Sequence, residues 1–330
     1  MGGLTRFLAA AVAALACMAA GAQAPRVIDL QAHRGARGLT PENTLPSFAQ
    51  SLGIGVSTLE LDIAITRDRV PVISHDPLLN PDITRGPGGH FLATPGPAVV
   101  DLTWEDLRRY DVGRLKPGTG YARTFSQQQP IDGTRIPRLA DLFELVRRSG
   151  NTEVQFAIET KVTPLRPHET LPPEEFTRIV LDTIRAAGLE RRVSILSFDW
   201  RTLQLVQKLA PGVPTVYLTI QRGASRNVQP GSPWTAGFDI RDHGSVPRLV
   251  KAAGGHTWSS FWRDLDAASV QEAQSLGLKV LAWTVNEPAD MNRMLDLGVD
   301  GVVTDRPDLL RAELVRRGWP VPKATPVSFN

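Results

Sequence analysis

Short apolar runs alternate with amphipathic stretches along most of the chain. The apolar runs have the length of buried strands and lie at residues 27–33, 58–65, 154–161, 193–198, 215–220, 256–261, 280–285 and 298–305. Helical periodicity is found between them, at residues 44–53, 138–149, 174–187, 199–209, 265–276, 287–297 and 307–317. Strands and helices that alternate in this number predict an α/β fold, the (β/α)8 TIM barrel. A doubly wound sheet is the alternative, but no Gly-x-Gly-x-x-Gly motif follows the first strand.

Two segments interrupt this alternation. Residues 70–76 form an apolar run that follows the second strand too closely to allow a crossover helix. This spacing predicts a β-hairpin, whose antiparallel return strand brings His75 back to the level of Asp62. Residues 77 to about 136 are rich in glycine and proline and contain one short helical stretch. They are predicted to form a small subdomain inserted over one end of the barrel, where it would act as a substrate lid.

The first 24 residues have the features of an export signal. Arg6 precedes the apolar segment FLAAAVAALACMAA, which is too short to span a membrane, and the small-x-small sequence AQA follows it. We therefore predict an exported protein, periplasmic or secreted, whose mature chain starts at Pro25 and is not stably inserted in a membrane. An ordinary N-terminal helix and a lipoprotein processed at Cys17 are the alternatives. The predicted divisions of the chain are 1–24 for the signal, 25–320 for the barrel and 321–330 for a C-terminal tail.

Composition and charge argue against several classes of function. The 330-residue chain has a formal net charge of +3, and its basic isoelectric point gives a weak preference for anionic substrates. It has no long basic run and no interleaving of aromatic and basic residues, so we do not expect it to bind nucleic acid. Cys17 is the only cysteine, so the mature protein would have no disulfide, no thiol nucleophile and no cysteine metal site. The sequence leaves the oligomeric state open.

Three acidic residues lie on strand faces that should point into the barrel. Side chains alternate along a strand, so in the second predicted strand the apolar set faces the helices while Glu60 and Asp62 face inward. Glu159 faces inward on the next strand for the same reason. Their mutual repulsion calls for a cation, and a hard divalent ion suits ligands that are all oxygen. The alternative is that these acids only form ion pairs with Arg34 and Lys161.

Histidines lie at the ends of two predicted strands. His33 and Arg34, in the motif AHRG, end the first strand, and His75 ends the return strand of the hairpin. The carboxyl ends of barrel strands are where barrel enzymes carry their catalytic groups. The planar guanidinium of Arg34 suits phosphate, and imidazoles titrate in the range that proton transfer requires. Each histidine alone is weak evidence, because structural histidines are common, but the ordered set of motifs is specific.

These ordered motifs resemble those of the glycerophosphodiester phosphodiesterase family. The matching stretches are AHRG, PENTLPSF, LELDIAITRDRVPVISHD, AIETK, LSFD, AWTVN and GVDGVVTDRP. They span essentially the whole mature chain, and the insertion follows His75 and Asp76, where the family carries one. The residues after Asp76, PLLNPDITRG, depart from the common form of the family, which leaves the lid contacts and the headgroup preference open.

The resemblance implies a barrel hydrolase that cleaves glycerophosphodiesters to sn-glycerol 3-phosphate and an alcohol. It implies that Glu60, Asp62 and Glu159 hold one divalent metal ion. It also implies that His33 and His75 form the acid–base pair and that Arg34 and Lys161 bind phosphate. Ca²⁺ is favoured for an exported protein with all-oxygen ligands, and Mg²⁺ is the alternative. Which histidine is the acid, and whether water or a hydroxyl of the substrate attacks, are left open.

Two further residues are candidates for the substrate pocket, and two other functions are kept as alternatives. Glu42 is placed to orient Arg34 or the substrate, or only to serve as an acid in the first turn of a helix. Trp283 is placed to form a wall of the pocket or to fill the bottom of the barrel.

One alternative function is a phosphodiesterase of the lysophospholipase D or sphingomyelinase D kind, which a wide apolar groove under the lid would favour. The other is an exported binding protein without catalysis, which chelator-sensitive activity would exclude.

Overall fold

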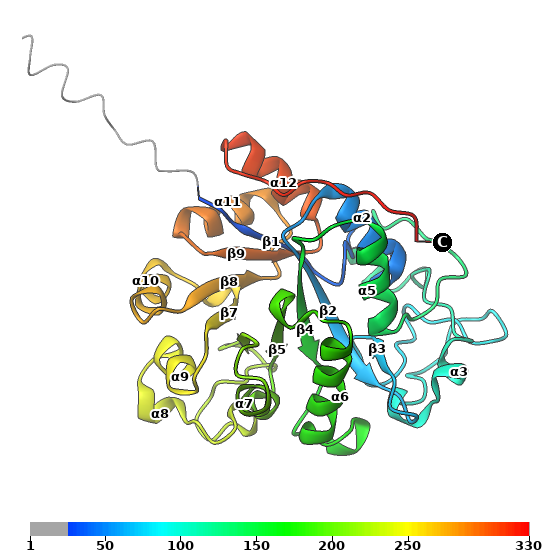
Figure 1. Ribbon diagram of the computed structural model, residues 1–330, viewed down its shortest axis with the longest axis horizontal. Coiled ribbons are helices and arrows are strands. Elements are labelled where there is room, and N and C mark those ends of the chain that lie inside the picture. The colour runs from blue at the N-terminus through cyan, green and yellow to red at the C-terminus, as the bar shows by residue number, and fades with distance from the viewer. Residues whose placement is uncertain (1–25, 330) are drawn as a thin grey trace, which may run out of the picture.

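The parallel sheet of this protein closes into a barrel. The computed structural model describes residues 26–329, so the predicted export signal, its cleavage before Pro25 and Cys17 lie outside the described residues. The parallel strands are β1 (Asp29–Ala32), β2 (Thr58–Ile65), β4 (Gln155–Thr160), β5 (Val193–Ser197), β6 (Thr215–Thr219), β7 (Thr257–Phe261), β8 (Lys279–Trp283) and β9 (Gly301–Thr304). β1 pairs with both β9 and β2, which closes the ring (Figure 1). The predicted (β/α)8 TIM barrel is therefore confirmed, and the doubly wound sheet is excluded.

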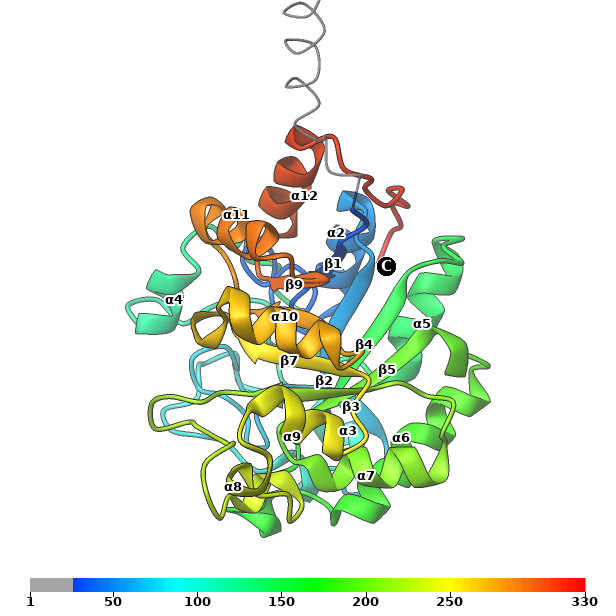
Figure 2. The ribbon, with the colours of Figure 1, turned by 90° about the vertical axis from the view of Figure 1, so that its left-hand side faces the viewer.

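Helices cover the outside of the barrel, as Figures 1 and 2 show. They are α2 (Leu45–Ile54), α5 (Leu139–Arg148), α6 (Pro173–Ala186), α7 (Trp200–Leu209), α8 (Ile240–His243), α9 (Val246–Ala252), α10 (Ala267–Ser275), α11 (Pro288–Leu297) and α12 (Pro307–Arg316). Single 3₁₀ turns lie at η2 (Pro167–Glu169), η3 (Glu190–Arg192), η4 (Pro233–Thr235) and η5 (Trp262–Asp264). No helix within residues 26–329 is long and apolar enough to cross a membrane.

Alternating side chains separate two apolar regions on the two sides of the sheet. Leu59, Leu61 and Ile63 of β2 are fully buried in the layer between the strands and the helices. A smaller cluster fills the inside of the barrel and consists of Ala157, Leu196, Val216, Leu218 and Leu281. Acidic residues on the inward faces of β2 and β4 are thereby held at the edge of a packed apolar interior.

β2 continues into the predicted hairpin. β3 (Pro71–Ile73) runs antiparallel to the end of β2, with Ile73 opposite Ile63. The backbone N–H of Ser74 then donates to the carbonyl of Asp62 at 2.9 Å. The return strand therefore brings His75 to the level of Asp62, as the sequence predicts.

Within the described chain, the segment between β3 and α5 contributes no strand to the barrel sheet. It contains η1 (Val99–Asp101) and the short helices α3 (Trp104–Leu107) and α4 (Gly120–Thr124). Its apolar side chains pack in a cluster of their own with Ala64 and Val72 of the hairpin region. This cluster includes Leu79, Val99, Leu107, Val112 and Ile136. This segment, called the inserted segment below, therefore packs as a unit against the hairpin. That it is an insertion, its limits at 77 and 136 and its role as a lid stay predictions.

Candidate active site

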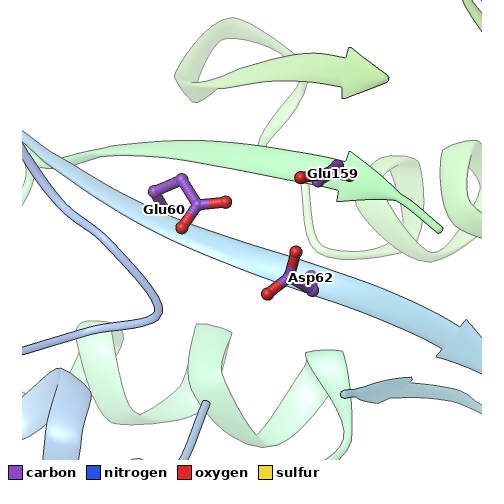
Figure 3. A group of neighbouring side chains, drawn as sticks. All are labelled: Glu60, Asp62 and Glu159. Carbon is purple, nitrogen blue, oxygen red and sulfur yellow. The ribbon is translucent and has the colours of Figure 1, made fainter. Parts of the chain in front are cut away.

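Three buried carboxylates meet on the inward faces of the neighbouring strands β2 and β4. Asp62 lies beside Glu159 in the parallel register of the two strands, and Glu60 occupies the preceding inward position of β2. One oxygen from each of the three side chains lies within 4.8 Å of those of the other two. Figure 3 shows the three carboxyl groups on these two neighbouring strands. Strand alternation therefore produces the acidic cluster that the sequence predicts.

Two buried cations contact this cluster. The Nζ of Lys161 lies 2.6 Å from Oε1 of Glu159 and 3.6 Å from Oδ1 of Asp62. The Nε of Arg34 lies 3.3 Å from Oδ2 of Asp62, and its Nη1 lies 2.7 Å from Oε1 of Glu42. Both cations of the ion-pair alternative are therefore in contact with the acids, and Glu42 orients Arg34 from its other side.

The acids and cations of this cluster do not balance in charge. The carboxylates of Glu42 and the three clustered acids outnumber the cations Arg34 and Lys161 by two. Oδ1 of Asp62 is buried and has no hydrogen-bond partner among the described residues. Burying an unpaired carboxylate oxygen is costly, and a divalent cation would supply both the missing charge and the missing partner. The residues present therefore fit a divalent metal ion with oxygen ligands.

Burial and mutual repulsion perturb the pKa values of the three acids. Burial, together with the charges of Asp62 and Glu159, raises the pKa of Glu60 well above its ordinary value. Burial and the charge of Asp62 raise the pKa of Glu159 to about 7, against the opposing effect of Lys161. Burial acts on Asp62 as well, but His75 and the two cations outweigh it and lower the pKa of Asp62. Protons therefore occupy part of the cluster in the absence of a metal ion.

The imidazole of His33, which follows β1, is oriented by a carboxylate. Its Nδ1 lies 2.7 Å from Oδ1 of Asp305, and an ionised carboxylate only accepts hydrogen bonds, so Nδ1 carries the hydrogen. The other ring nitrogen, Nε2, lies 3.9 Å from Oε2 of Glu60. Burial and the charge of Arg37 lower the pKa of His33 to about 4. At neutral pH the ring is thus neutral with an unprotonated Nε2, the form that a general base needs.

The imidazole of His75, at the end of the hairpin, is oriented in the same way. Its Nδ1 lies 2.8 Å from Oδ1 of Asp76, and Oδ2 of Asp76 accepts a hydrogen bond from Nδ2 of Asn80 at 2.8 Å. Burial and the charge of Arg34 lower the pKa of His75 from its ordinary value. Each of the two predicted histidines therefore has a carboxylate at Nδ1, which leaves Nε2 to face a substrate.

The loop after β1 uses an uncommon backbone conformation to aim its side chains. Arg34 and Asn43 have positive φ angles of 52° and 55°, a region that residues other than glycine rarely adopt. Arg34 donates from its backbone N–H to Oε2 of Glu60 at 2.8 Å. Asn43 donates from Nδ2 to Oδ2 of Asp62 at 2.9 Å. The loop therefore holds two of the acids in place, and such backbone strain is typical of functional sites.

One cavity is lined by most of the predicted groups. Its lining includes His33, Arg34, Glu60, His75, Glu159, Lys161 and Trp283. Trp283 forms part of an apolar wall, with its ring centroid 5.4 Å from that of Phe198 and its Nε1–H donating to the carbonyl of Ser259 at 3.0 Å. Asp62 and Glu42 contact the lining cations Arg34 and Lys161 from behind.

Among the residues that contact the predicted groups, Arg37, Tyr121 and Asp305 were not identified from the sequence. Asp305 lies in the motif GVDGVVTDRP directly after the last strand, and that position is a signal which could have identified it. Arg37 lies a few residues after the AHRG motif in the same loop. Tyr121 belongs to the inserted segment, and no local signal connects it with the barrel.

Comparison with known proteins finds similarity along most of the chain. Residues 33–309 match the model of the glycerophosphoryl diester phosphodiesterase family. The chain is 30% identical over 287 residues to a glycerophosphodiester phosphodiesterase of Caldanaerobacter subterraneus subsp. tengcongensis, covering 87% of this chain and 97% of that protein. A Silicibacter pomeroyi protein, described as a candidate glycerophosphoryl diester phosphodiesterase, has a similar structure, with a TM-score of 0.80, 37% identity and coverage of 89% of this chain and 95% of the other. The fold is shared with an Oleispira antarctica phosphodiesterase solved with the product sn-glycerol-3-phosphate, with a TM-score of 0.63, 20% identity and coverage of 86% and 96%.

Proposed function

We propose that this chain, which belongs to the glycerophosphoryl diester phosphodiesterase family, hydrolyses glycerophosphodiesters to sn-glycerol 3-phosphate and an alcohol. One observation carries the proposal: three buried carboxylates, two cations and two imidazoles are grouped at one cavity. The cavity lies where the strands of the barrel end, which is where barrel enzymes keep their chemistry. A phosphodiester is anionic, and this set of groups can neutralise its charge and transfer protons to and from its oxygens.

A divalent metal ion is part of the proposal. Glu60, Asp62 and Glu159 would hold it, and it would neutralise the charge that builds up on the phosphoryl oxygens. Ca²⁺ is the first choice because all the ligands are oxygen and export is expected, and Mg²⁺ is the second. Reconstitution of the chelated enzyme with each ion in turn distinguishes the two.

The side chains of the cavity divide the remaining work. Arg34 and Lys161 would bind the non-bridging phosphoryl oxygens, and Glu42 would keep Arg34 in place. One of the two imidazoles, His33 or His75, would take the proton of the attacking oxygen, and the other would protonate the oxygen of the leaving alcohol. The wall around Trp283 would pack against carbon atoms of the substrate.

An assay on two substrates tests this function. The purified protein should release glycerol phosphate from glycerophosphocholine and from glycerophosphoethanolamine. Activity should disappear in excess chelator and return with Ca²⁺ or Mg²⁺, because the acidic cluster alone repels the anionic substrate. Absence of hydrolysis with either substrate in the presence of both ions would refute the proposal.

The expected cellular location is a separate proposal. Arg6, the apolar segment and the AQA sequence support export with cleavage before Pro25. Intact-mass measurement of protein from the periplasm or the medium should give the mass of a chain that starts at Pro25. A chain that starts at Met1 or at a lipid-modified Cys17 would contradict it.

A further inference from the structure

The carboxylate that orients His33 is itself held by an arginine. Nε and Nη2 of Arg37 lie 2.8 and 3.0 Å from Oδ1 and Oδ2 of Asp305. Oδ1 of Asp305 is also the atom that accepts the hydrogen bond from Nδ1 of His33. A pair with two parallel contacts fixes the plane of the carboxylate as well as its position. Nδ2 of Asn286 also donates to Oδ2 of Asp305, at 2.7 Å. Arg37 and Asn286 together therefore fix the direction in which Asp305 presents its oxygen to the imidazole.

Arg37 is in turn enclosed by the inserted segment. The hydroxyl of Tyr121, in α4, accepts a hydrogen bond from Nη1 of Arg37 at 3.2 Å. The ring of Phe125 lies against the guanidinium, with its centroid 4.4 Å from Cζ. Nε2 of Gln128 donates to the carbonyl of Arg37 at 2.8 Å. Arg37 is only 9% exposed, and its Nη2 also lies 3.1 Å from Nδ1 of His33. Three side chains of the inserted segment therefore contact a buried cation that lies beside both Asp305 and His33.

The hydroxyl of Tyr121 also reaches the proposed phosphate-binding side of the site. It donates to Oε2 of Glu42, whose Oε1 contacts Nη1 of Arg34 at 2.7 Å. A tyrosine hydroxyl has one hydrogen to donate and lone pairs to accept with, and both are used here. One oxygen atom of the inserted segment thus connects the supports of His33 and Arg34.

We propose that Tyr121 is a positioning residue, through which the inserted segment orients His33 and Arg34. The proposal rests on the proposed function, because these two residues have their roles only in that reaction. It gives the inserted segment a part in the assembly of the active site, in addition to the cover that the sequence predicts. Tyr121 itself does not line the cavity, so it acts through the two side chains that do.

Kinetics of Tyr121→Phe test the proposal, since the change keeps the ring beside Phe125 and removes only the hydroxyl. The kcat on glycerophosphocholine should fall about 10- to 100-fold, because hydrogen bonds to two charged groups are lost. The KM should change less than about threefold, because the hydroxyl contacts no substrate. Tyr110→Phe, in the apolar cluster of the same segment, is the matched control and should keep wild-type kinetics.

A double variant separates positioning from a general loss of structure. In a His33→Ala background, Tyr121→Phe should cost less than it costs in the wild type, because one of the groups that it orients is gone. An equal loss in both backgrounds would overturn the proposal, as would a raised KM at unchanged kcat.

Long-range ¹H–¹⁵N spectra of the six histidine rings give a readout that does not depend on activity. His33 should carry its hydrogen on Nδ1 in the wild type and show a second form in Tyr121→Phe. If the wild type hydrolyses no glycerophosphodiester but this change is seen, the proposed function fails, and the orientation of the His33 ring by Tyr121 still stands. If the wild type is active and Tyr121→Phe alters neither kcat nor the spectrum, the positioning role fails and the proposed function stands.

Discussion

Single residues in this site work in pairs of an imidazole and a carboxylate. His33 is paired with Asp305 at 2.7 Å, and His75 is paired with Asp76 at 2.8 Å. In both pairs the carboxylate accepts a hydrogen bond from Nδ1–H, which fixes the tautomer and leaves Nε2 without a hydrogen. In the proposed reaction one ring would start neutral and accept a proton at Nε2, and the other would start protonated at Nε2 and donate it to the leaving oxygen.

The two histidines can be tested by substitution. His33→Ala and His75→Ala should each lower kcat by about 10²- to 10⁴-fold, because each removes a proton-transfer group. The double variant should lose less than the product of the two effects, because groups that act as a unit are not additive. Kinetics on glycerophosphocholine measure both, and His90→Ala, in an exposed loop of the inserted segment, serves as the control.

The leaving group distinguishes the acid from the base. A diester of p-nitrophenol has a leaving group that needs no proton, so it should rescue one histidine variant and not the other. The rescued variant lacks the general acid. If both variants stay folded and fully active on a glycerophosphodiester, the acid–base assignment is wrong, and Glu42 or Lys161 would have to transfer the protons.

Asp62→Asn tests the metal site, because it removes one ligand charge and keeps the shape of the side chain. The kcat/KM should fall more than about 100-fold and the affinity for Ca²⁺ at least about tenfold. Isothermal titration calorimetry measures the affinity, with Asp182→Asn, whose side chain is 71% exposed on α6, as the control. Wild-type affinity for Ca²⁺ in Asp62→Asn would contradict the assignment.

Sequence reasoning finds the acids of this site more readily than the residues that support them. Glu60 and Glu159 are predicted because a strand has a period of two, so their direction follows from their neighbours. Asp305 and Arg37 are 268 positions apart in the chain, and their contact exists only after the barrel has closed. Such supporting contacts depend on tertiary structure, and no local pattern encodes them.

At the scale of elements, β2 links the stability of the barrel to the site. All of its residues are buried, and its two faces have opposite chemistry. The apolar face packs under the helices, whereas the acidic face reaches the cavity. A slip of one residue in register would exchange the two faces, so burial of the apolar face fixes the direction of the acids.

Leu61→Ala tests this burial. The side chain is fully buried, and it lies in sequence between Glu60 and Asp62, two proposed metal ligands. Its loss should cost about 2–5 kcal/mol of the free energy of unfolding. Urea denaturation measures this cost. Leu165→Ala is the matched control, because Leu165 is 65% exposed and its loss should change the stability by less than about 0.5 kcal/mol. Equal effects of the two changes would contradict the packing described for β2.

The sequence predicts the regular elements well wherever they are long enough to show a period. The strand at β2 and the hairpin that ends in β3 are predicted correctly, because apolar alternation and a short turn define both. The helices α8 and α9 are missed, since they have only 4 and 7 residues. Gly244 ends the first in a left-handed conformation and Ser245 caps the second, so neither has enough turns to show helical periodicity.

At the scale of the whole molecule, the last strand and the C-terminal residues that the structure describes contact β1 and α2. β9 pairs with β1, and in both views the C-terminal residues lie beside α2 (Figures 1 and 2). The N–H of Thr325 donates to the carbonyl of Leu52 at 2.8 Å, and Arg311 contacts the carbonyls of Gly55 and Pro322. The pairing of β1 with β9 therefore closes the barrel, and the contact of Asp305 with His33 lies at the ends of these same two strands.

A carboxylate of the last helix gives the stability of the whole molecule a measurable pH dependence. Glu313, in α12, accepts hydrogen bonds from Nε of Arg316 and Nε of Arg317, both at 3.0 Å. Arg317 also contacts Asp296 of α11 at 2.7 Å. The hydrogen bonds from Arg316 and Arg317 lower the pKa of Glu313 from its ordinary 4.5 to about 2. Ionised Glu313 therefore stabilises the folded state above pH 4.5, and this contribution is lost as the pH falls from 4.5 to about 2.

Glu313→Gln should therefore destabilise the protein only where Glu313 is ionised. At pH 7 the variant should lose about 1–2 kcal/mol of the free energy of unfolding, because hydrogen bonds to a charged group are replaced by weaker ones. The difference in the free energy of unfolding between the variant and the wild type should shrink as the pH falls below 4.5. In that range Glu313 is protonated in the unfolded wild-type protein but still ionised in the folded one, so protonation favours unfolding. Urea denaturation at a series of pH values measures it, with Glu105→Gln, whose side chain is 76% exposed, as the control expected to change stability by less than about 0.5 kcal/mol. A difference that is the same at pH 3 and at pH 7 would show that Glu313 acts through its shape and not through its charge.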